Sequence, residues 1–158
     1  MNKKIPQELK IGQIKKLREL FKKNGVISAY QFGSIIEKNS PKNELSDYDF
    51  AIYFDDRKKY KTIFGRQVKM MNDISKILNF PQVDAIDLNK ADPIIRHQAV
   101  FNGRNIYTIN KNKKIALEHR IVQDYEDIKP LNNEANKILK KFVLSGKIGK
   151  PMFYQKIN

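Results

Sequence analysis

The chain has 158 residues, of which 41% are hydrophobic and 30% are charged, values typical of one globular domain with a core of its own. It contains no cysteine, which excludes disulfides, zinc–thiolate sites and thiol nucleophiles. No apolar run is long enough to span a membrane and the first ten residues lack the apolar core of a signal peptide, so we expect a cytoplasmic protein with no membrane partner.

The formal net charge of +14 favours anionic partners. Lysine dominates this charge, since only six of the 31 basic residues are arginines, and the lysines are spread along the chain. We therefore interpret the charge as a general surface property that favours nucleotides or an acidic partner. A dedicated nucleic-acid groove is the less favoured alternative, because it requires a clustered basic footprint.

The first half of the chain predicts a helix, a strand, a loop and a second strand. Apolar residues recur at helical spacing over residues 8–23, and Asn24-Gly25 ends that helix. A strand over residues 26–32 leads to Gly33-Ser34, after which a short helical turn is broken near residues 39–41. Residues 47–54 are almost continuously apolar after an acidic start, as in a central strand.

The second half predicts a helix over residues 57–78, a strand over 82–88 and a helix that Asp92 caps and Pro93 begins, which runs to residue 101. A short strand over 104–109 and a helix over 112–128 follow, with a kink or restart at Pro130 and a continuation to residue 144. The expected buried stripe of the 57–78 helix is Tyr60, Phe64, Val68, Met71, Ile74 and Leu78.

This order of elements predicts an α/β (α+β) fold with a small mixed sheet of about four strands flanked by helices. We see no internal repeat and expect a single domain over residues 1–158, with its core at about 10–110 and a C-terminal helical extension at about 112–145.

The stretch around the first two strands carries the chemistry. Asp47 and Asp49 lie two residues apart on a strand, so both carboxylates point to the same face. Paired carboxylates suit Mg²⁺, which completes its shell with water and substrate phosphates. Gly33 allows a phosphate to approach the backbone, and Ser34 adds a hydroxyl donor. Together these residues predict a site for a nucleoside triphosphate and its metal.

A third carboxylate comes from the strand QVDAIDL, in which Asp84 and Asp87 point to opposite faces. Only one of them can join Asp47 and Asp49, as a metal ligand or a general base. If Asp84 is the one that joins them, we expect Asp87 to cap a turn or pair with a lysine. Asp55 and Asp56 are expected to cap the following helix.

Two histidines and two tyrosines have no spacing that indicates a site. His97 and His119 are far apart in the sequence, and we interpret both as surface or partner-facing residues. Tyr107 and Tyr125 are expected to pack.

The sequence resembles the nucleotidyltransferase superfamily of the DNA polymerase β type, and within it the minimal nucleotidyltransferase (MNT) antitoxins that are encoded beside HEPN toxins. The resemblance covers residues 10–110 and is carried by FGS at 32–34, SDYDFAIYF at 46–54, VDAIDL at 83–88 and NGRNIY at 102–107. The segment DYEDIKP at 124–130 is similar to a C-terminal helix common in these proteins.

The resemblance implies that Gly33 and Ser34 hold the triphosphate of ATP, that Asp47 and Asp49 bind two Mg²⁺ ions, and that Asp84 is the third catalytic and metal-binding acid. It implies transfer of AMP from ATP to a hydroxyl with release of pyrophosphate, the acceptor being a tyrosine of a partner HEPN toxin. One difference from the family is that residues 35–39 lack its arginine and second glycine. Lys38 is the cation available to replace that arginine.

Two other functions remain as alternatives. Small-molecule nucleotidyltransferases, such as those that modify aminoglycosides, share this core but commonly need additional substrate-binding structure. A catalytically weak binding antitoxin, or an RNA-binding module, would keep the fold and neutralise or bind its partner by contact alone.

Overall fold

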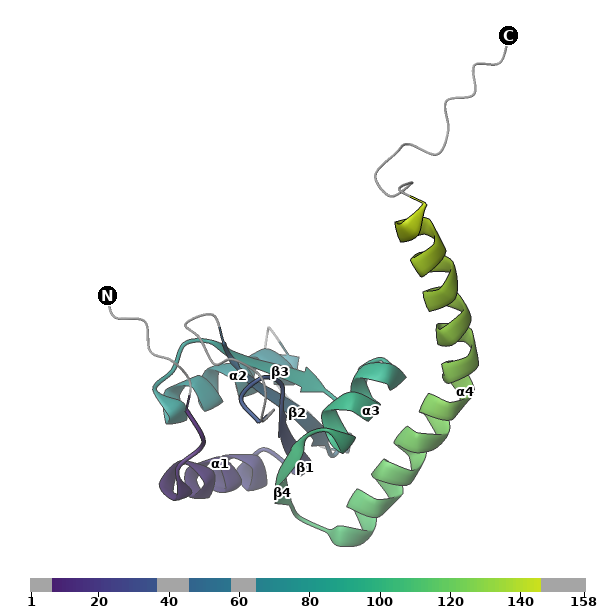
Figure 1. The fold of residues 1–158 in the computed structure, drawn as a ribbon. Coiled ribbons are helices and arrows are strands. Elements are labelled where there is room, and N and C mark those ends of the chain that lie inside the picture. Colours follow the sequence, from purple (N-terminus) through teal and green to yellow (C-terminus); the bar gives the residue numbers. More distant parts are fainter. Residues whose placement is uncertain (1–6, 37–45, 58–64, 146–158) are drawn as a thin grey trace.

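A computed structural model describes residues 7–36, 46–57 and 65–145 of the chain (Figure 1). The elements follow the order helix, two strands, helix, strand, helix, strand, helix. They are α1 (Ile11–Lys23), β1 (Val26–Phe32), β2 (Tyr48–Phe54), α2 (Gly65–Leu78), β3 (Val83–Asp87), α3 (Pro93–Phe101), β4 (Arg104–Thr108) and α4 (Lys111–Leu144). The predicted mixed sheet with flanking helices is confirmed.

The four strands form one sheet in the order β3-β2-β1-β4. β1 lies antiparallel to both β2 and β4, whereas β2 and β3 run parallel. The parallel pair is connected through α2, as a crossover between parallel strands requires. The two central strands, β1 and β2, therefore carry the two halves of the predicted site as immediate neighbours.

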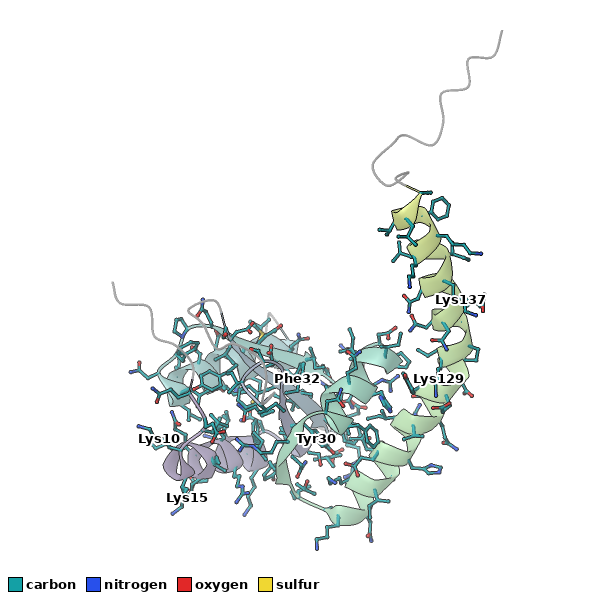
Figure 2. All side chains as sticks on the ribbon, viewed as in Figure 1. Lys10, Lys15, Tyr30, Phe32, Lys129 and Lys137 are labelled. Atoms are coloured by element: carbon teal, nitrogen blue, oxygen red, sulfur yellow. The ribbon has the colours of Figure 1, made fainter. Side chains whose placement is uncertain are left out.

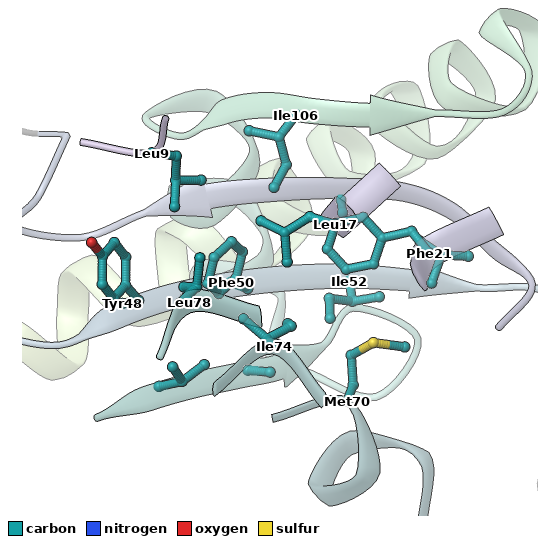
Figure 3. Packing of buried hydrophobic residues seen from close by; sticks show 14 of the residues in the cluster. Leu9, Leu17, Phe21, Tyr48, Phe50, Ile52, Met70, Ile74, Leu78 and Ile106 are labelled. Atoms are coloured by element: carbon teal, nitrogen blue, oxygen red, sulfur yellow. The ribbon is translucent and has the colours of Figure 1, made fainter. Parts of the chain in front are cut away.

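Helices cover both faces of the sheet, which explains why the central strands are almost continuously apolar. α1 and α2 lie against one face, and their core contains Leu17 and Phe21 from α1 with Ile74 from α2, packed on Phe50 and Ile52 of β2 (Figure 3). α3 and the first half of α4 cover the other face, where the smaller core consists of Tyr30, Ala51, Leu88, Ala99, Val100, Leu117 and Ile121.

Two helix starts differ from the predicted ones for local reasons, and a third is as predicted. α1 begins at Ile11 rather than residue 8, because the side chain of Gln13 accepts a hydrogen bond of 2.9 Å from the backbone N–H of Lys10 and caps the helix there. Among the described residues α2 begins at Gly65, and Arg57 lies in a turn that Asp55 holds through a hydrogen bond of 3.2 Å to the Arg57 N–H. The N-cap at Asp92 is confirmed, because its carboxylate accepts from the Ile94 N–H at 2.8 Å.

The predicted stripe of α2 needs correction. Ile74 and Leu78 are buried as expected, but Met70 takes the third buried position while Val68 is 38% exposed and Met71 is only partly buried. Tyr60 and Phe64 lie outside the described residues. With the helix starting at Gly65, the face toward the sheet is shifted by a residue at its N-terminal end.

α4 is a single helix of 34 residues that contains Pro130, so of the predicted kink or restart at this proline the restart does not occur. Figure 1 shows the helix bending near its middle and its second half extending away from the sheet. Proline removes one backbone hydrogen bond and crowds the preceding turn, which kinks a helix. None of the described helices is long and apolar enough to cross a membrane.

Candidate active site

Alternation along β2 separates its core residues from its carboxylates. Tyr48, Phe50 and Ile52 belong to the core under α1 and α2, so Asp49, with Asp47 just before the strand, points to the opposite face, which α3 and α4 cover farther along the sheet. Both carboxylates are half-buried. The side chains of Tyr48 and Phe80 meet edge to face at 5.1 Å between ring centroids and fix this end of the strand.

β3 brings a third carboxylate to the same place. Its parallel register with β2 puts Asp84 directly opposite Asp49. Val83 and Ala85 pack into the α1 and α2 core, so Asp84 between them points to the carboxylate face. The three acids that the family resemblance implies are therefore brought together by strand pairing.

The electrostatics of Asp49 reflect this crowding. Burial, followed by the negative charges of Asp47 and Asp84, raises the pKa of its carboxyl group to about 6. The raised pKa means that the charged form of Asp49 is disfavoured by burial and by its acidic neighbours, with no cation among the described residues to offset them. A divalent cation would offset them.

Gly33 lies directly against Asp49. β1 and β2 pair so that Phe32 is opposite Asp49, and Gly33 follows with φ of +80°. A Cβ at this position would be 2.1 Å from Asp49 Oδ2, which is not tolerated. Ser34 comes next in a single turn closed by a 3.2 Å hydrogen bond from the Ile36 N–H to the Gly33 carbonyl. The predicted phosphate turn thus borders the carboxylates.

No group of three or more His, Asp and Glu side chains is already drawn together as a metal cluster within residues 7–36, 46–57 and 65–145. One reason that the carboxylates do not form such a cluster is that Asp84 Oδ1 accepts a 2.7 Å hydrogen bond from the backbone N–H of Ala85. Like charges also repel when no cation separates them. The donor set of three carboxylates, all oxygen ligands, nevertheless fits Mg²⁺.

Asp87 has a structural partner of its own on the other face of β3. Its carboxylate accepts two hydrogen bonds from Arg66, at 2.8 Å from Nε and 3.2 Å from Nη2, and a third at 3.0 Å from the Asn89 N–H. The prediction was that Asp87 caps a turn or pairs with a lysine. It caps the turn after β3 through the Asn89 N–H, and its ionic partner is an arginine, whose planar guanidinium suits the bidentate geometry.

Asp55 and Asp56 do not cap α2. Arg57 donates to Asp55, whose pKa is well below its ordinary range because of that contact. Asp56 accepts from Arg66 at 2.9 Å and from Asn89 at 2.8 Å. These two acids therefore stabilise the end of β2 that lies away from the candidate site.

His97, which was predicted to be a surface or partner-facing residue, is only partly exposed. Its ring stacks on Tyr125 of α4 at 4.0 Å and on Phe101 at 4.7 Å, so it joins α3 to α4. Tyr125 packs as predicted, and so does Tyr107, whose ring contacts Phe21 at 5.7 Å. His119 is exposed, as predicted.

A small cavity of about 230 Å³ beside the phosphate turn adds residues that the sequence did not single out. Ile35 and Ile36 line it together with Asn102, Gly103 and Arg104, and Glu8 completes it. Arg104 donates to Gln31 Oε1 at 2.9 Å and so holds β4 against the end of β1. In the sequence, only the glycine turn before β4 pointed to this place. The structure requires glycine there, because a Cβ at Gly103 would be 2.1 Å from the Ala99 carbonyl oxygen.

The family model described as polymerase beta, nucleotidyltransferase, matches residues 15–112 of the chain. This match contains all of the sheet and the three carboxylates, and it covers more than half of the sequence. The chain therefore belongs to the polymerase beta nucleotidyltransferase family, as the sequence motifs predicted.

Several solved structures share the fold. A toxin-antitoxin with AMP-PNP is 21% identical, with a TM-score of 0.61 over 85% of this chain and 99% of that chain. The toxin-antitoxin MntA-HepT is 19% identical, with a TM-score of 0.59 over 83% and 97% of the two chains. The structure of the tri-AMPylated HEPN toxin of Shewanella oneidensis in complex with MNT antitoxin is 19% identical, with a TM-score of 0.59 over 83% of this chain and 96% of that chain. No curated protein matches the chain.

Proposed function

We propose that this chain is a Mg²⁺-dependent antitoxin that transfers AMP from ATP to a tyrosine hydroxyl of a HEPN-type toxin. The observation that carries the proposal is the meeting of Asp47, Asp49 and Asp84 on one face, with Gly33 directly against Asp49. We place the reaction in the cytoplasm, in a single domain over residues 1–158.

In the proposed reaction, the acceptor oxygen forms a bond to the α-phosphorus of ATP. The bond from that phosphorus to the oxygen that bridges to the β-phosphate breaks, and pyrophosphate leaves with the bonding electron pair. The hydroxyl proton passes to a carboxylate of the site, for which Asp84 is suited because it is exposed and lies at the rim. The turn of Gly33 and Ser34 holds the phosphates by backbone N–H groups and a hydroxyl.

Two Mg²⁺ ions would be held by Asp47 and Asp49, one of them shared with Asp84. When bound, such ions lower the pKa of an acceptor hydroxyl and neutralise the triphosphate and the leaving pyrophosphate. Asp84 must exchange its hydrogen bond to the Ala85 N–H for this role. The raised pKa of Asp49 supports the assignment, because it marks negative charge that a cation would stabilise.

The solved neighbours support the acceptor and the nucleotide. One is a toxin-antitoxin with AMP-PNP, and another holds a tri-AMPylated HEPN toxin with its MNT antitoxin. The match covers nearly the whole length of those chains, which supports a shared fold from end to end. We extend their nucleotide and partner to this chain on that basis.

The test is incubation of the purified chain with isotopically labelled ATP and Mg²⁺, with and without a HEPN protein encoded beside it, followed by intact-mass measurement of both chains. We expect a mass gain of one or more AMP units on the partner. The double variant Asp47→Asn/Asp49→Asn should show none. Glu19→Gln, which removes an exposed charge on α1, is the matched control and should retain transfer.

A partner that binds tightly but gains no mass would contradict the transferase proposal and favour the binding antitoxin. Protection of cells by the Asp47→Asn/Asp49→Asn variant at the level of the parent would contradict it as well.

A further inference from the structure

The second half of α4 contributes no buried residue to the core of the described chain. The buried residues of this helix, Leu117 and Ile121, lie in its first half. From Asn133 to Ser145 every residue is exposed, and Figure 2 shows the part of α4 that carries Lys137 standing clear of the sheet and its helices. A helix of this length is marginal in water by itself. Contact with another surface would stabilise it.

Apolar side chains form a regular stripe on this segment. Ile128, Leu131, Ala135, Ile138 and Phe142 follow one another at spacings of three, four, three and four residues, which is the a and d pattern of a coiled coil. We call these five residues the distal stripe. Leu131 is 75% exposed and Ile138 is 54% exposed. Leu139, Val143 and Leu144 widen the stripe at its C-terminal end and are exposed too.

Charge divides the segment into two ends of opposite sign. Glu126, Asp127 and Glu134 lie toward its start, where Lys129 pairs with Glu126 at 2.9 Å. Lys137, Lys140 and Lys141 lie toward its end, and no acidic residue follows them within α4. Two copies of this helix packed in opposite directions bring the acidic end of each against the basic end of the other. A parallel arrangement would place like charges together.

We propose that the distal stripe is a self-association surface on which a second copy of this chain packs in an antiparallel direction. In the centred register Ala135 faces Ile138 of the second copy, and Leu131 faces its Phe142. The small alanine opposite the larger isoleucine lets the two helices approach closely. Glu134 then faces Lys141 of the second copy across the edge of the stripe. No residue of the candidate active site takes part.

The absence of cysteine allows a direct test of direction in the full-length chain. Two variants, Ala135→Cys and Ile138→Cys, are mixed under mild oxidation and separated on a non-reducing gel. Antiparallel pairing predicts that the mixed disulfide between the two variants dominates, since facing positions lie within disulfide reach. Asn133→Cys, on the opposite side of the helix, is the control and should not cross-link.

Sedimentation over a range of concentrations gives the strength of the association. Leu131→Ala appears twice in each dimer, and we expect it to raise the dissociation constant at least about 100-fold. Glu134→Lys should also weaken the dimer, and Glu134→Lys/Lys141→Glu should restore it, because the facing charges are exchanged together. Recovery in the double variant depends on the pairing and not on helix content.

Three results would overturn the proposal. One is a monomer at about 100 µM, where an association of this size should be populated. Another is a disulfide between two copies of Ala135→Cys in preference to the mixed one. The third is a dimer that Leu131→Ala leaves intact while binding of a HEPN protein is lost, which would assign the stripe to that partner.

Discussion

At the scale of single residues, Gly33 combines a positive φ with close contact to a catalytic candidate. Replacement by alanine strains the backbone, and the added Cβ displaces the carboxylate of Asp49, from which it would be only 2.1 Å away. We expect Gly33→Ala to lower the rate of AMP transfer at least about 100-fold, since small misplacements of reacting groups have effects of this size. Gly12→Ala is the control, because nothing lies within 4 Å of its Cβ position.

Asp49 gives a prediction about stability and pH. Folding raises the pKa of its carboxyl group from 3.8 to about 6, so the neutral form is favoured in the folded state and the charged form opposes folding. The unfavourable contribution grows as the pH rises from 3.8 to 6 and is complete above that range. In the absence of metal, Asp49→Asn should therefore raise the free energy of unfolding at pH 8 by about 1–2 kcal/mol after solvent screening.

The measurement is urea unfolding of parent and variant in a chelating buffer at pH 8 and pH 5. The gain should be about half as large at pH 5, because the carboxyl group of the parent is then largely protonated. An equal gain at both pH values would contradict the electrostatic explanation. Added Mg²⁺ should stabilise the parent and leave Asp49→Asn almost unchanged.

Substitutions of Asp84 and Asp87 should affect different properties, the first activity and the second stability. Asp84 is exposed, so Asp84→Asn should change the free energy of unfolding by less than about 0.5 kcal/mol while reducing AMP transfer at least about 100-fold. Asp87 forms a buried bidentate pair with Arg66. Asp87→Ala should cost about 1.5–3 kcal/mol, because Arg66 loses its bidentate partner while it keeps its contact with Asp56.

Thermal unfolding and a transfer assay below the melting temperature of each variant distinguish the two roles. Full activity in Asp84→Asn would return Asp87 to consideration as the third acid.

The residues of the site could be predicted where strand periodicity places them. Spacing alone puts Asp47 and Asp49 on one face and separates Asp84 from Asp87. It could not decide between Asp84 and Asp87, because the decision depends on the register of β3 against β2 and on Arg66, which comes from α2. The stacking of His97 on Tyr125 likewise depends on how α4 folds back against α3 after β4, which spacing does not show.

At the scale of elements, the strands were predicted within about a residue because apolar runs and turn residues mark both ends. The start of α2 was not, because it depends on the local turn that Asp55 forms with Arg57. Pro130 predicted either a kink or a restart of α4, and the sequence could not decide between them. Because Pro130 is exposed, water can satisfy the carbonyl that loses its partner, so a bend suffices.

The two halves of α4 should respond differently to truncation of apolar side chains. Ile121 is fully buried against the sheet, and Ile121→Ala should lower the free energy of unfolding by about 2–4 kcal/mol. Ile115, on the same half of the helix, is 61% exposed, and Ile115→Ala should cost less than about 0.5 kcal/mol. Urea unfolding at low micromolar protein measures both, and similar losses would mean that α4 is not held to the sheet by Ile121.

At the scale of the whole molecule, composition indicated a globular chain but not the strand order, which arises from pairings between distant segments. β4 pairs with β1, about 75 residues earlier, through contacts such as Ala29 with Tyr107. The net charge of +14 is likewise a property of the whole surface. It suits attraction to ATP and to an acidic partner over distances of about 10 Å at ordinary ionic strength.

The antiparallel pairing of β1 with β2 has a consequence for how this family can diversify. Hydrogen bonds between the strands, and not the intervening connection, keep Gly33 beside Asp49. The length and sequence of the connection can therefore change over generations while the reacting groups keep their separation.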